Sequence, residues 1–262
     1  MSDAQDLLTA ALDRITDRPP LLVALDFDGT LAPLQDDPEQ SRMFPEAAQA
    51  LARLAARPEL VRVALVSGRA MADLHRLAAP PVGTVLIGSH GAERAQVAPH
   101  GLDRQDIRLD TAQADRLDQL GSRMQAVARG RDGVWVETKP AAVVVHTRLA
   151  EPEVREPAES EALAIGHELG SAVLHGKNVV EVSVLTADKG AAVTALRAEL
   201  GAGAVLYAGD DVTDEHALQV LTDGDLGVKI GPGETVARYR LADPEAMTAL
   251  LVDLAGRLPA NG

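Results

Sequence analysis

The chain has 262 residues, a formal net charge of −14 at pH 7 and no cysteine. Its hydrophobic content of 46% is enough for one large domain, or for a core domain with a smaller insert. The acidic charge argues against a nucleic-acid partner, because a phosphate backbone needs a basic surface. Disulfides and thiolate sites are excluded. No apolar run reaches the length of a membrane helix and the first residues do not resemble a secretion signal, so we expect a cytoplasmic protein without membrane contact.

The N-terminal part of the chain alternates apolar strands with amphipathic helices. Helical spacing of apolar residues predicts a first helix around residues 7–15, and Pro45 is typical of the first turn of another. The expected elements are helices at 7–15, 45–56 and 70–78, and strands at 21–25, 61–66 and 85–87. Strands that alternate with helices in this way are typical of a parallel sheet.

The middle of the chain has a different pattern. It predicts helices at 110–129 and 159–169 and two strand pairs, 134–138 with 142–147 and 172–174 with 179–182. Alternating helices and hairpins indicate an α+β arrangement with antiparallel strands. Residues 151–157 look like a linker, and Trp135, the only tryptophan, is expected in the core of this segment.

The last part of the chain returns to the first pattern. A helix is expected at 189–200, a strand at 204–208, a final strand at 226–230 and a closing helix at 244–258. We therefore predict a doubly wound, Rossmann-like α/β core with a parallel sheet, formed by residues 1–104 and 185–262. An α+β cap domain, residues 105–184, is inserted into it.

Polar residues follow three of the predicted core strands, and a lysine opens one of the helices. Because the carboxyl ends of parallel strands share one edge of the sheet, these groups are expected to converge there. They are Asp26 and Asp28 after the first strand, Ser67, Gly68 and Arg69 after the second, Lys189 at the helix start, and Asp210, Asp211 and Asp214.

This convergence is suited to phosphoryl transfer. Clustered carboxylates repel one another unless a cation neutralises them, and hard oxygen ligands favour Mg²⁺ over Zn²⁺. Ser67 and the backbone N–H groups near Gly29 and Gly68 can bind phosphate oxygens, and Lys189 supplies positive charge. Asp26, at the strand end, is placed to attack phosphorus, and Asp28 to transfer protons.

The segments DFDGTLAP, SGR, DKG and GDDVTDE resemble, in order and spacing, the four motifs of the haloacid dehalogenase (HAD) superfamily of phosphatases. The resemblance implies that Asp26 is the nucleophile, that Asp28 is the general acid and base, and that Lys189 is catalytic. The implied phosphate-binding set is Thr30, Ser67, Gly68 and Lys189. The implied Mg²⁺ ligands are Asp26, Asp28 through its backbone carbonyl, and Asp210, with Asp211 and Asp214 in support.

A narrower resemblance covers nearly the whole chain. GSHGAE, VETKPAAVVVHTR and GKNVVEV are similar to segments of the trehalose-6-phosphate phosphatase family. Members of this family catalyse the last step of trehalose biosynthesis, and their cap closes over the sugar. The resemblance implies that the cap of this chain binds the sugar through Glu137, Lys139, His146, Arg148, Lys177 and Glu181. Lys139 and Lys177 also fit ordinary turn lysines. Ser183 stands where the family usually has arginine.

Two residues of the core keep alternative interpretations. Arg69 binds phosphate, caps a helix or pairs with an acid, and His90 contacts substrate or packs at a strand end; both stay candidate substrate-binding residues. Other hypotheses for the chain are a phosphatase for another glycosyl phosphate, such as sucrose phosphate or a glucosyl or mannosyl phosphoglycerate, and a non-catalytic regulatory subunit. The expected partner is a small sugar phosphate. We expect a monomer, with association with a sugar-phosphate synthase as a further hypothesis.

Overall fold

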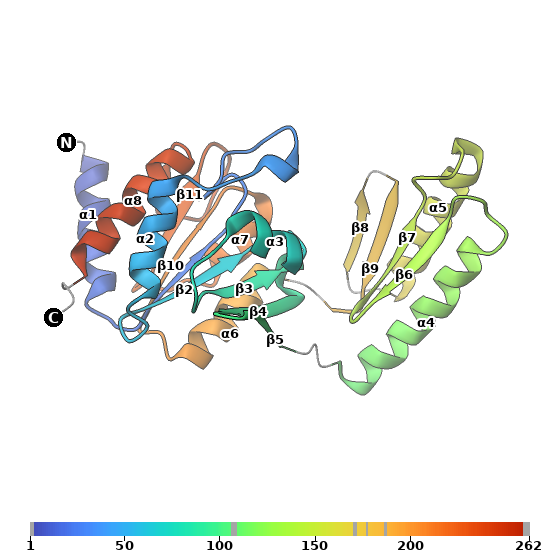
Figure 1. Cartoon of the computed structure of the whole chain (residues 1–262), viewed down its shortest axis with the longest axis horizontal. Coiled ribbons are helices and arrows are strands. Elements are labelled where there is room, and N and C mark those ends of the chain that lie inside the picture. Colours follow the sequence, from blue (N-terminus) through green and yellow to red (C-terminus); the bar gives the residue numbers. More distant parts are fainter. Residues whose placement is uncertain (1–2, 106–108, 170–171, 177, 186–187, 259–262) are drawn as a thin grey trace. The chain divides into compact units, whose positions relative to one another are not determined.

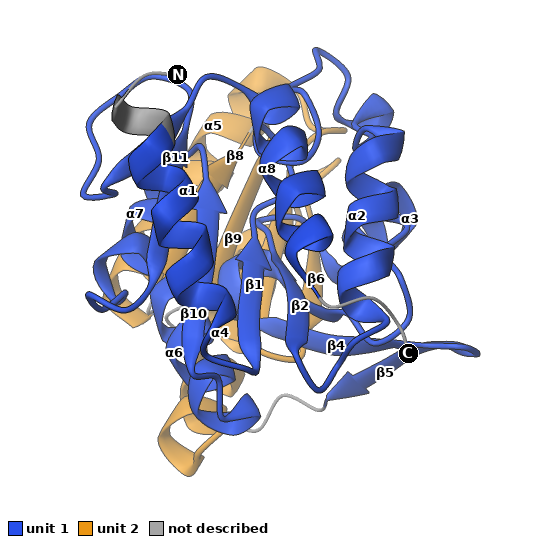
Figure 2. Ribbon diagram, turned by 90° about the vertical axis from the view of Figure 1, so that its left-hand side faces the viewer, with its two compact units in different colours: residues 1–105, 188–262 blue, residues 106–187 orange. Residues whose placement is uncertain are grey.

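The computed structural model describes residues 3–105, 109–169, 172–176, 178–185 and 188–258. The chain divides into two compact units, shown in blue and orange in Figure 2. Unit 1 contains residues 1–105 and 188–262, and unit 2 contains residues 106–187. The sequence placed the boundaries after residues 104 and 184. Among the described residues, no helix combines the length and apolar character needed to cross a bilayer.

Unit 1 contains an eight-stranded sheet in the order β12-β11-β10-β1-β2-β3-β4-β5 (Figure 1). The six strands from β12 to β3 are parallel, and β4 and β5 are antiparallel to their neighbours. The predicted α/β core with a mainly parallel sheet is therefore confirmed. The strand bounds are β1 (Leu21–Leu25), β2 (Val61–Val66), β3 (Val85–Gly88), β4 (Glu93–Ala98), β5 (Gly101–Gln105), β10 (Ala204–Gly209), β11 (Leu226–Ile230) and β12 (Tyr239–Leu241).

Helices cover both faces of this sheet. Successive side chains of a strand point to opposite faces, so Leu21, Val23 and Leu25 of β1 enter one core cluster and Leu22 and Ala24 enter another. The first cluster includes α1 (Asp3–Thr16), α2 (Pro45–Ala55), α3 (Met71–Ala78) and α8 (Pro244–Arg257). The second includes α6 (Lys189–Leu200) and α7 (Val212–Gln219). Both faces of β1 are therefore buried, which explains its unbroken apolar sequence.

Unit 2 is a four-stranded antiparallel sheet with two helices, as the sequence predicted. The order is β6-β7-β9-β8, and alternate valines of the two central strands pack against the helices. The bounds are α4 (Thr111–Ala128), β6 (Trp135–Lys139), β7 (Ala142–His146), α5 (Pro152–Leu169), β8 (Ala172–Gly176) and β9 (Val179–Ser183). The opposite face of the sheet carries Glu137 and Lys139 of β6, which alternate with Val136.

Three expectations about individual segments were wrong, and one hairpin was missed. The hairpin of β4 and β5 was not expected, although Ala95 and Val97 alternate with exposed or half-buried residues along β4. Helix α5 begins at Pro152, so residues 152–157 are its first turns and not a linker. The charged residues among them hid the helical pattern. The strand at 226–230 is not the last, because β12 follows it. Trp135 is half-buried and lies outside the core cluster of unit 2.

Candidate active site

Three neighbouring strands of unit 1 bring the predicted site residues to one edge of the sheet. β10, β1 and β2 lie side by side and run in the same direction, so Asp210, Asp26 and Ser67, which follow them, share that edge. Asp26 continues the pairing beyond β1, since its N–H donates to the carbonyl of Ala208 at 3.0 Å. Ser67 is fixed in the same way by the carbonyl of Ile87, at 2.9 Å.

The turn after β1 needs a glycine. Gly29 has a φ of +74°, and its N–H donates to the carbonyl of Ala32 at 2.8 Å. A Cβ atom at this position would lie 2.1 Å from Oδ2 of Asp210. The carboxylate of Asp210 therefore rests directly against the turn that follows Asp26.

Lys189 joins two of the acids. It begins α6, and its Nζ donates to Oδ1 of Asp26 at 2.9 Å and to Oδ1 of Asp214 at 2.7 Å. Burial disfavours its charge, but Asp26 and Asp214 outweigh that effect and raise the pKa of Lys189 above its ordinary value. Lys189 is therefore protonated, which suits the binding of an anion beside Asp26.

The acids on β1, β10 and α7 form a cluster of ligand atoms. Carboxylate oxygens of Asp26, Asp210 and Asp214 lie within 4.8 Å of one another. Burial and the neighbouring acids raise the pKa of Asp26 well above its usual range despite Lys189, and burial together with Asp214 raises the pKa of Asp210. Carboxylates that repel one another at this distance fit a hard divalent cation such as Mg²⁺.

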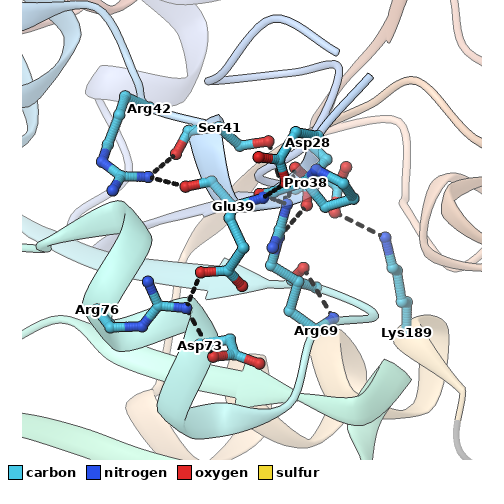
Figure 3. A network of polar contacts seen from close by, with 12 residues as sticks. Asp28, Pro38, Glu39, Ser41, Arg42, Arg69, Asp73, Arg76 and Lys189 are labelled. Carbon is cyan, nitrogen blue, oxygen red and sulfur yellow. Dashed lines mark hydrogen bonds and ion pairs between the residues drawn. The ribbon is translucent and has the colours of Figure 1, made fainter. Parts of the chain in front are cut away.

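Arg69 holds Asp28 in a bidentate ion pair (Figure 3). Its Nε donates to Oδ2 of Asp28 at 2.6 Å and its Nη2 to Oδ1 at 2.7 Å. The same Nη2 also donates to the carbonyl of Pro38 at 2.8 Å and to Oγ of Ser41 at 3.1 Å. Hydrogen bonding to Asp28 raises the pKa of the Arg69 guanidinium. Of the three alternatives for Arg69, the structure shows the pairing with an acid.

A cavity of about 560 Å³ opens at this strand edge. Its lining includes Asp26, Asp28, Ser67, Gly68, Arg69, His90, Lys189, Asp210 and Asp211, so the structure brings most of the predicted core residues together. His90 is packed against Gly68, where a Cβ atom would lie 2.5 Å from its ring, and its backbone has a left-handed φ of 57°. Leu34, Gln35, Pro38, Ser41 and Thr213 complete the lining.

Two predicted core residues do not line the cavity. Thr30 is fully buried, and its hydroxyl has no hydrogen-bond partner among the described residues, so its place in the phosphate site stays a prediction. Asp214 is also fully buried and accepts hydrogen bonds from Lys189, Asp211 and Tyr207. Tyr207 was missed because it reads as an ordinary residue of a buried strand.

Lys229 is a second buried lysine that the sequence analysis missed. It lies on β11, and its Nζ donates to the backbone carbonyl of Asp210. Its charge lowers the pKa of Asp210, against the larger effects of burial and Asp214. A lysine inside an otherwise apolar strand was the signal that was available in the sequence.

Most of the predicted sugar-binding residues gather on the sheet of unit 2. Nζ of Lys139 lies 2.8 Å from Oε2 of Glu181, and Nε2 of His146 lies 2.8 Å from Oε2 of Glu137. The ring of His146 stacks on Trp135 with centroids 4.8 Å apart. The guanidinium of Arg148 lies over the same tryptophan, 5.2 Å from the ring centroid. Lys177 lies outside the described residues.

A sequence profile of the trehalose-phosphatase family matches residues 24–245. The chain belongs to this family. The trehalose-phosphate phosphatase of Mycobacterium avium is 34% identical over 273 residues, which cover 98% of this chain and 68% of that protein. The predicted family resemblance is thus confirmed.

Solved structures of the family have the same fold. A crystal structure of a trehalose-6-phosphate phosphatase related protein, 25% identical, matches with a TM-score of 0.61 over 90% of this chain and 97% of that chain. The trehalose-6-phosphate phosphatase of Aspergillus fumigatus, 23% identical, matches in fold with a TM-score of 0.67 over 95% and 97%.

Some relatives are much longer than this chain. A Mycobacterium tuberculosis protein called an uncharacterized glycosyl hydrolase is 34% identical over 97% of this chain, which spans only 19% of that protein. A bifunctional trehalose-6-phosphate synthase/phosphatase of Thermoproteus tenax is also 34% identical, and 32% of its length is covered.

Proposed function

We propose that this chain is a Mg²⁺-dependent phosphatase that hydrolyses trehalose 6-phosphate to trehalose and phosphate through an aspartyl-phosphate intermediate. The observation that carries the proposal is the position of Asp26. Its carboxylate borders the cavity, is bonded to the protonated Lys189, and has a second carboxylate, Asp28, two residues away. Family membership supports the same reaction class and substrate.

In the proposed reaction Asp26 and Asp28 have separate tasks. A carboxylate oxygen of Asp26 attacks phosphorus, and the bond between phosphorus and the sugar oxygen breaks as Asp28 donates a proton to that oxygen. Asp28 then takes a proton from water, which attacks the aspartyl phosphate and releases phosphate and free Asp26. Both oxygens of Asp28 accept bonds from Arg69, so proton transfer requires one of them to turn toward the leaving group.

The remaining core residues bind the phosphate group and the metal. Lys189, Ser67 and the backbone at Gly68 would hold phosphate oxygens at the edge of the sheet, near the attacking carboxylate. Asp26, Asp210 and the carbonyl of Asp28 would hold Mg²⁺, with Asp211 and Asp214 in support. The bound cation would neutralise the charge that develops on the transferred phosphoryl group.

For the sugar, we propose the polar face of unit 2. Lys139 and Glu181 offer a donor and an acceptor side by side, an arrangement that suits the paired hydroxyls of a disaccharide. Glu137, His146 and Arg148 lie on the same sheet or directly after it, and Lys177 is kept as a further candidate. We propose unit 1 as the catalytic domain and unit 2 as the specificity domain.

The test is phosphate release from a panel of sugar phosphates with Mg²⁺. Trehalose 6-phosphate is expected to be the best substrate, and Asp26→Asn to remove all turnover. Lys139→Ala and Glu181→Ala are expected to lower kcat/KM for trehalose 6-phosphate about tenfold or more, the value of one charged hydrogen bond, and to leave 4-nitrophenyl phosphate unaffected.

Other outcomes identify the alternatives. Turnover of sucrose phosphate or of a phosphoglycerate derivative without trehalose 6-phosphate would refute the substrate and keep the chemistry. A protein that binds the sugar phosphate and releases no phosphate from any substrate would be the regulatory subunit considered above.

A further inference from the structure

A chain of buried polar groups lies behind the candidate nucleophile. The hydroxyl of Tyr207 donates to Oδ1 of Asp214 at 2.6 Å. The same oxygen accepts a hydrogen bond from Nζ of Lys189 at 2.7 Å, and Nζ also donates to Asp26 at 2.9 Å. Each of these four residues is at most 5% exposed. The chain leads from the middle of β10 to the carboxylate that attacks phosphorus in the proposed mechanism.

Asp214 is the central acceptor in this series of hydrogen bonds. Its carboxylate is held by donors from three elements: Tyr207 on β10, Lys189 on α6, and the N–H of Asp211 at the start of α7, which donates to Oδ2 at 2.9 Å. Gly209 packs against it so closely that a Cβ atom there would lie 2.1 Å from its Cγ. Asp214 does not line the cavity, and its carboxylate accepts hydrogen bonds from these buried donors.

The packing of the Tyr207 ring does not explain why this residue carries a hydroxyl group. The ring is fully buried among the apolar side chains of one core cluster, which phenylalanine would fill equally well. A buried hydroxyl costs free energy unless it forms a hydrogen bond, and this one donates to Asp214. Without the Tyr207 hydroxyl, the carboxylate of Asp214 loses one of the donors that fix it in place facing Lys189.

We propose that Tyr207 is a positioning residue, whose hydroxyl fixes Asp214 so that Asp214 holds Nζ of Lys189 against Asp26. The proposal rests on the proposed phosphatase function for its kinetic consequences. Its structural content, that the hydroxyl determines where Lys189 lies, is independent of that function.

The experiment compares Tyr207→Phe with Tyr239→Phe, which removes the hydroxyl of the only other tyrosine. Tyr239 is half-buried on β12 and packs against the other core cluster of unit 1. Tyr207→Phe is expected to lower kcat about tenfold, the effect of losing one hydrogen bond to a charged group, and to leave KM within about twofold. Tyr239→Phe is expected to leave both constants unchanged. Wild-type kcat in Tyr207→Phe would overturn the proposal.

A double-mutant cycle separates positioning from a general loss of stability. If Tyr207 acts through Asp214, adding Tyr207→Phe to Asp214→Asn is expected to cause little further loss of kcat, and the two changes in unfolding free energy are expected to be non-additive. Additive effects on both quantities would overturn the proposal.

A crystal structure of Tyr207→Phe gives a readout that does not depend on activity. Nζ of Lys189 is expected to move beyond hydrogen-bonding distance of Asp26, about 3.5 Å. An unchanged Lys189 would overturn the proposal. A wild-type protein without phosphatase activity would refute the proposed function instead, and the structure and the stability cycle would still decide the role of Tyr207.

Discussion

Replacing Asp26 by asparagine is expected to abolish phosphate release and, in the metal-free protein, to raise the free energy of unfolding. Asp26 is buried, and burial together with the repulsion of Asp214 and Asp210 raises its pKa well above its ordinary value, although Lys189 opposes this. A carboxyl whose pKa is higher in the folded than in the unfolded state is destabilising once it ionises. The penalty is absent below the unfolded pKa, about 3.9, and grows as the pH rises toward the folded pKa.

The magnitude follows from the distances. At an effective dielectric constant of about 20, a carboxylate within 4.8 Å repels Asp26 by at least about 3.5 kcal/mol, and Lys189 at 2.9 Å attracts it by about 6 kcal/mol. The repulsions of Asp210 and Asp214 together slightly exceed that attraction, and burial of the charge adds to the penalty. Asparagine keeps the shape and an acceptor for Lys189, so we expect a gain of about 1–3 kcal/mol, within the range of single stabilising substitutions.

The assay is urea unfolding at pH 7 with a chelator, repeated with Mg²⁺. The matched control is Asp28→Asn, the same chemical change two residues away, which breaks the ion pair with Arg69 and is expected to destabilise by about 1–2 kcal/mol. Mg²⁺ should stabilise the wild type more than Asp26→Asn, because the variant lacks one ligand charge. A metal-free Asp26→Asn protein that is less stable than the wild type would refute the reasoning.

Two further predictions concern stability and the turn after β1. Asp225 accepts four hydrogen bonds, and although burial opposes its charge, these bonds lower its pKa. Asp225→Asn should lower the free energy of unfolding in urea at neutral pH by about 2–3 kcal/mol, whereas Asp223→Asn, at an exposed position, should not change it. The loss in Asp225→Asn should shrink as the pH falls through the folded pKa of Asp225, because the wild type then loses the same charge. Gly29→Ala should remove phosphatase activity, because the new methyl group would displace Asp210. Gly83 has a similar φ of +92° with open space around it, so Gly83→Ala should lower only the stability of the protein. An active Gly29→Ala protein would contradict the role of the contact between Gly29 and Asp210.

The strand ends of the site were predictable because two simple rules apply to them. Apolar runs of strand length, separated by amphipathic helices, predict a parallel sheet, and parallel strands end at one edge. Asp26, Ser67 and Asp210 follow from these rules although β1 and β10 are far apart in the sequence. The same rules do not reveal strands whose signal is weak, and so the hairpin of β4 and β5 and the three-residue β12 were missed.

The partners of the site residues were not predictable in the same way. Arg69 and Asp28 are brought together by the turns after two different strands, and their bidentate contact depends on side-chain rotamers that no spacing specifies. Tyr207 lies within an apolar strand, so the pattern assigns it to the core. Lys229 is unusual in such a strand, but the pattern does not reveal its partner. Only the packed structure shows that a helix start, α7, supplies the acid that Tyr207 holds.

The four acids Asp26, Asp28, Asp211 and Asp214 differ in burial and in their hydrogen-bond partners. Asp26 is buried beside Lys189, a position that suits the proposed nucleophile. Asp28 is partly exposed and held by Arg69, which it would have to release to transfer protons as proposed. Asp214 is sealed in the core by three donors, and Asp211 is exposed and caps α7. Carboxylates with such different partners and exposure differ in their freedom to move, so a single strand edge can hold the proposed nucleophile, the proposed proton carrier and structural acids.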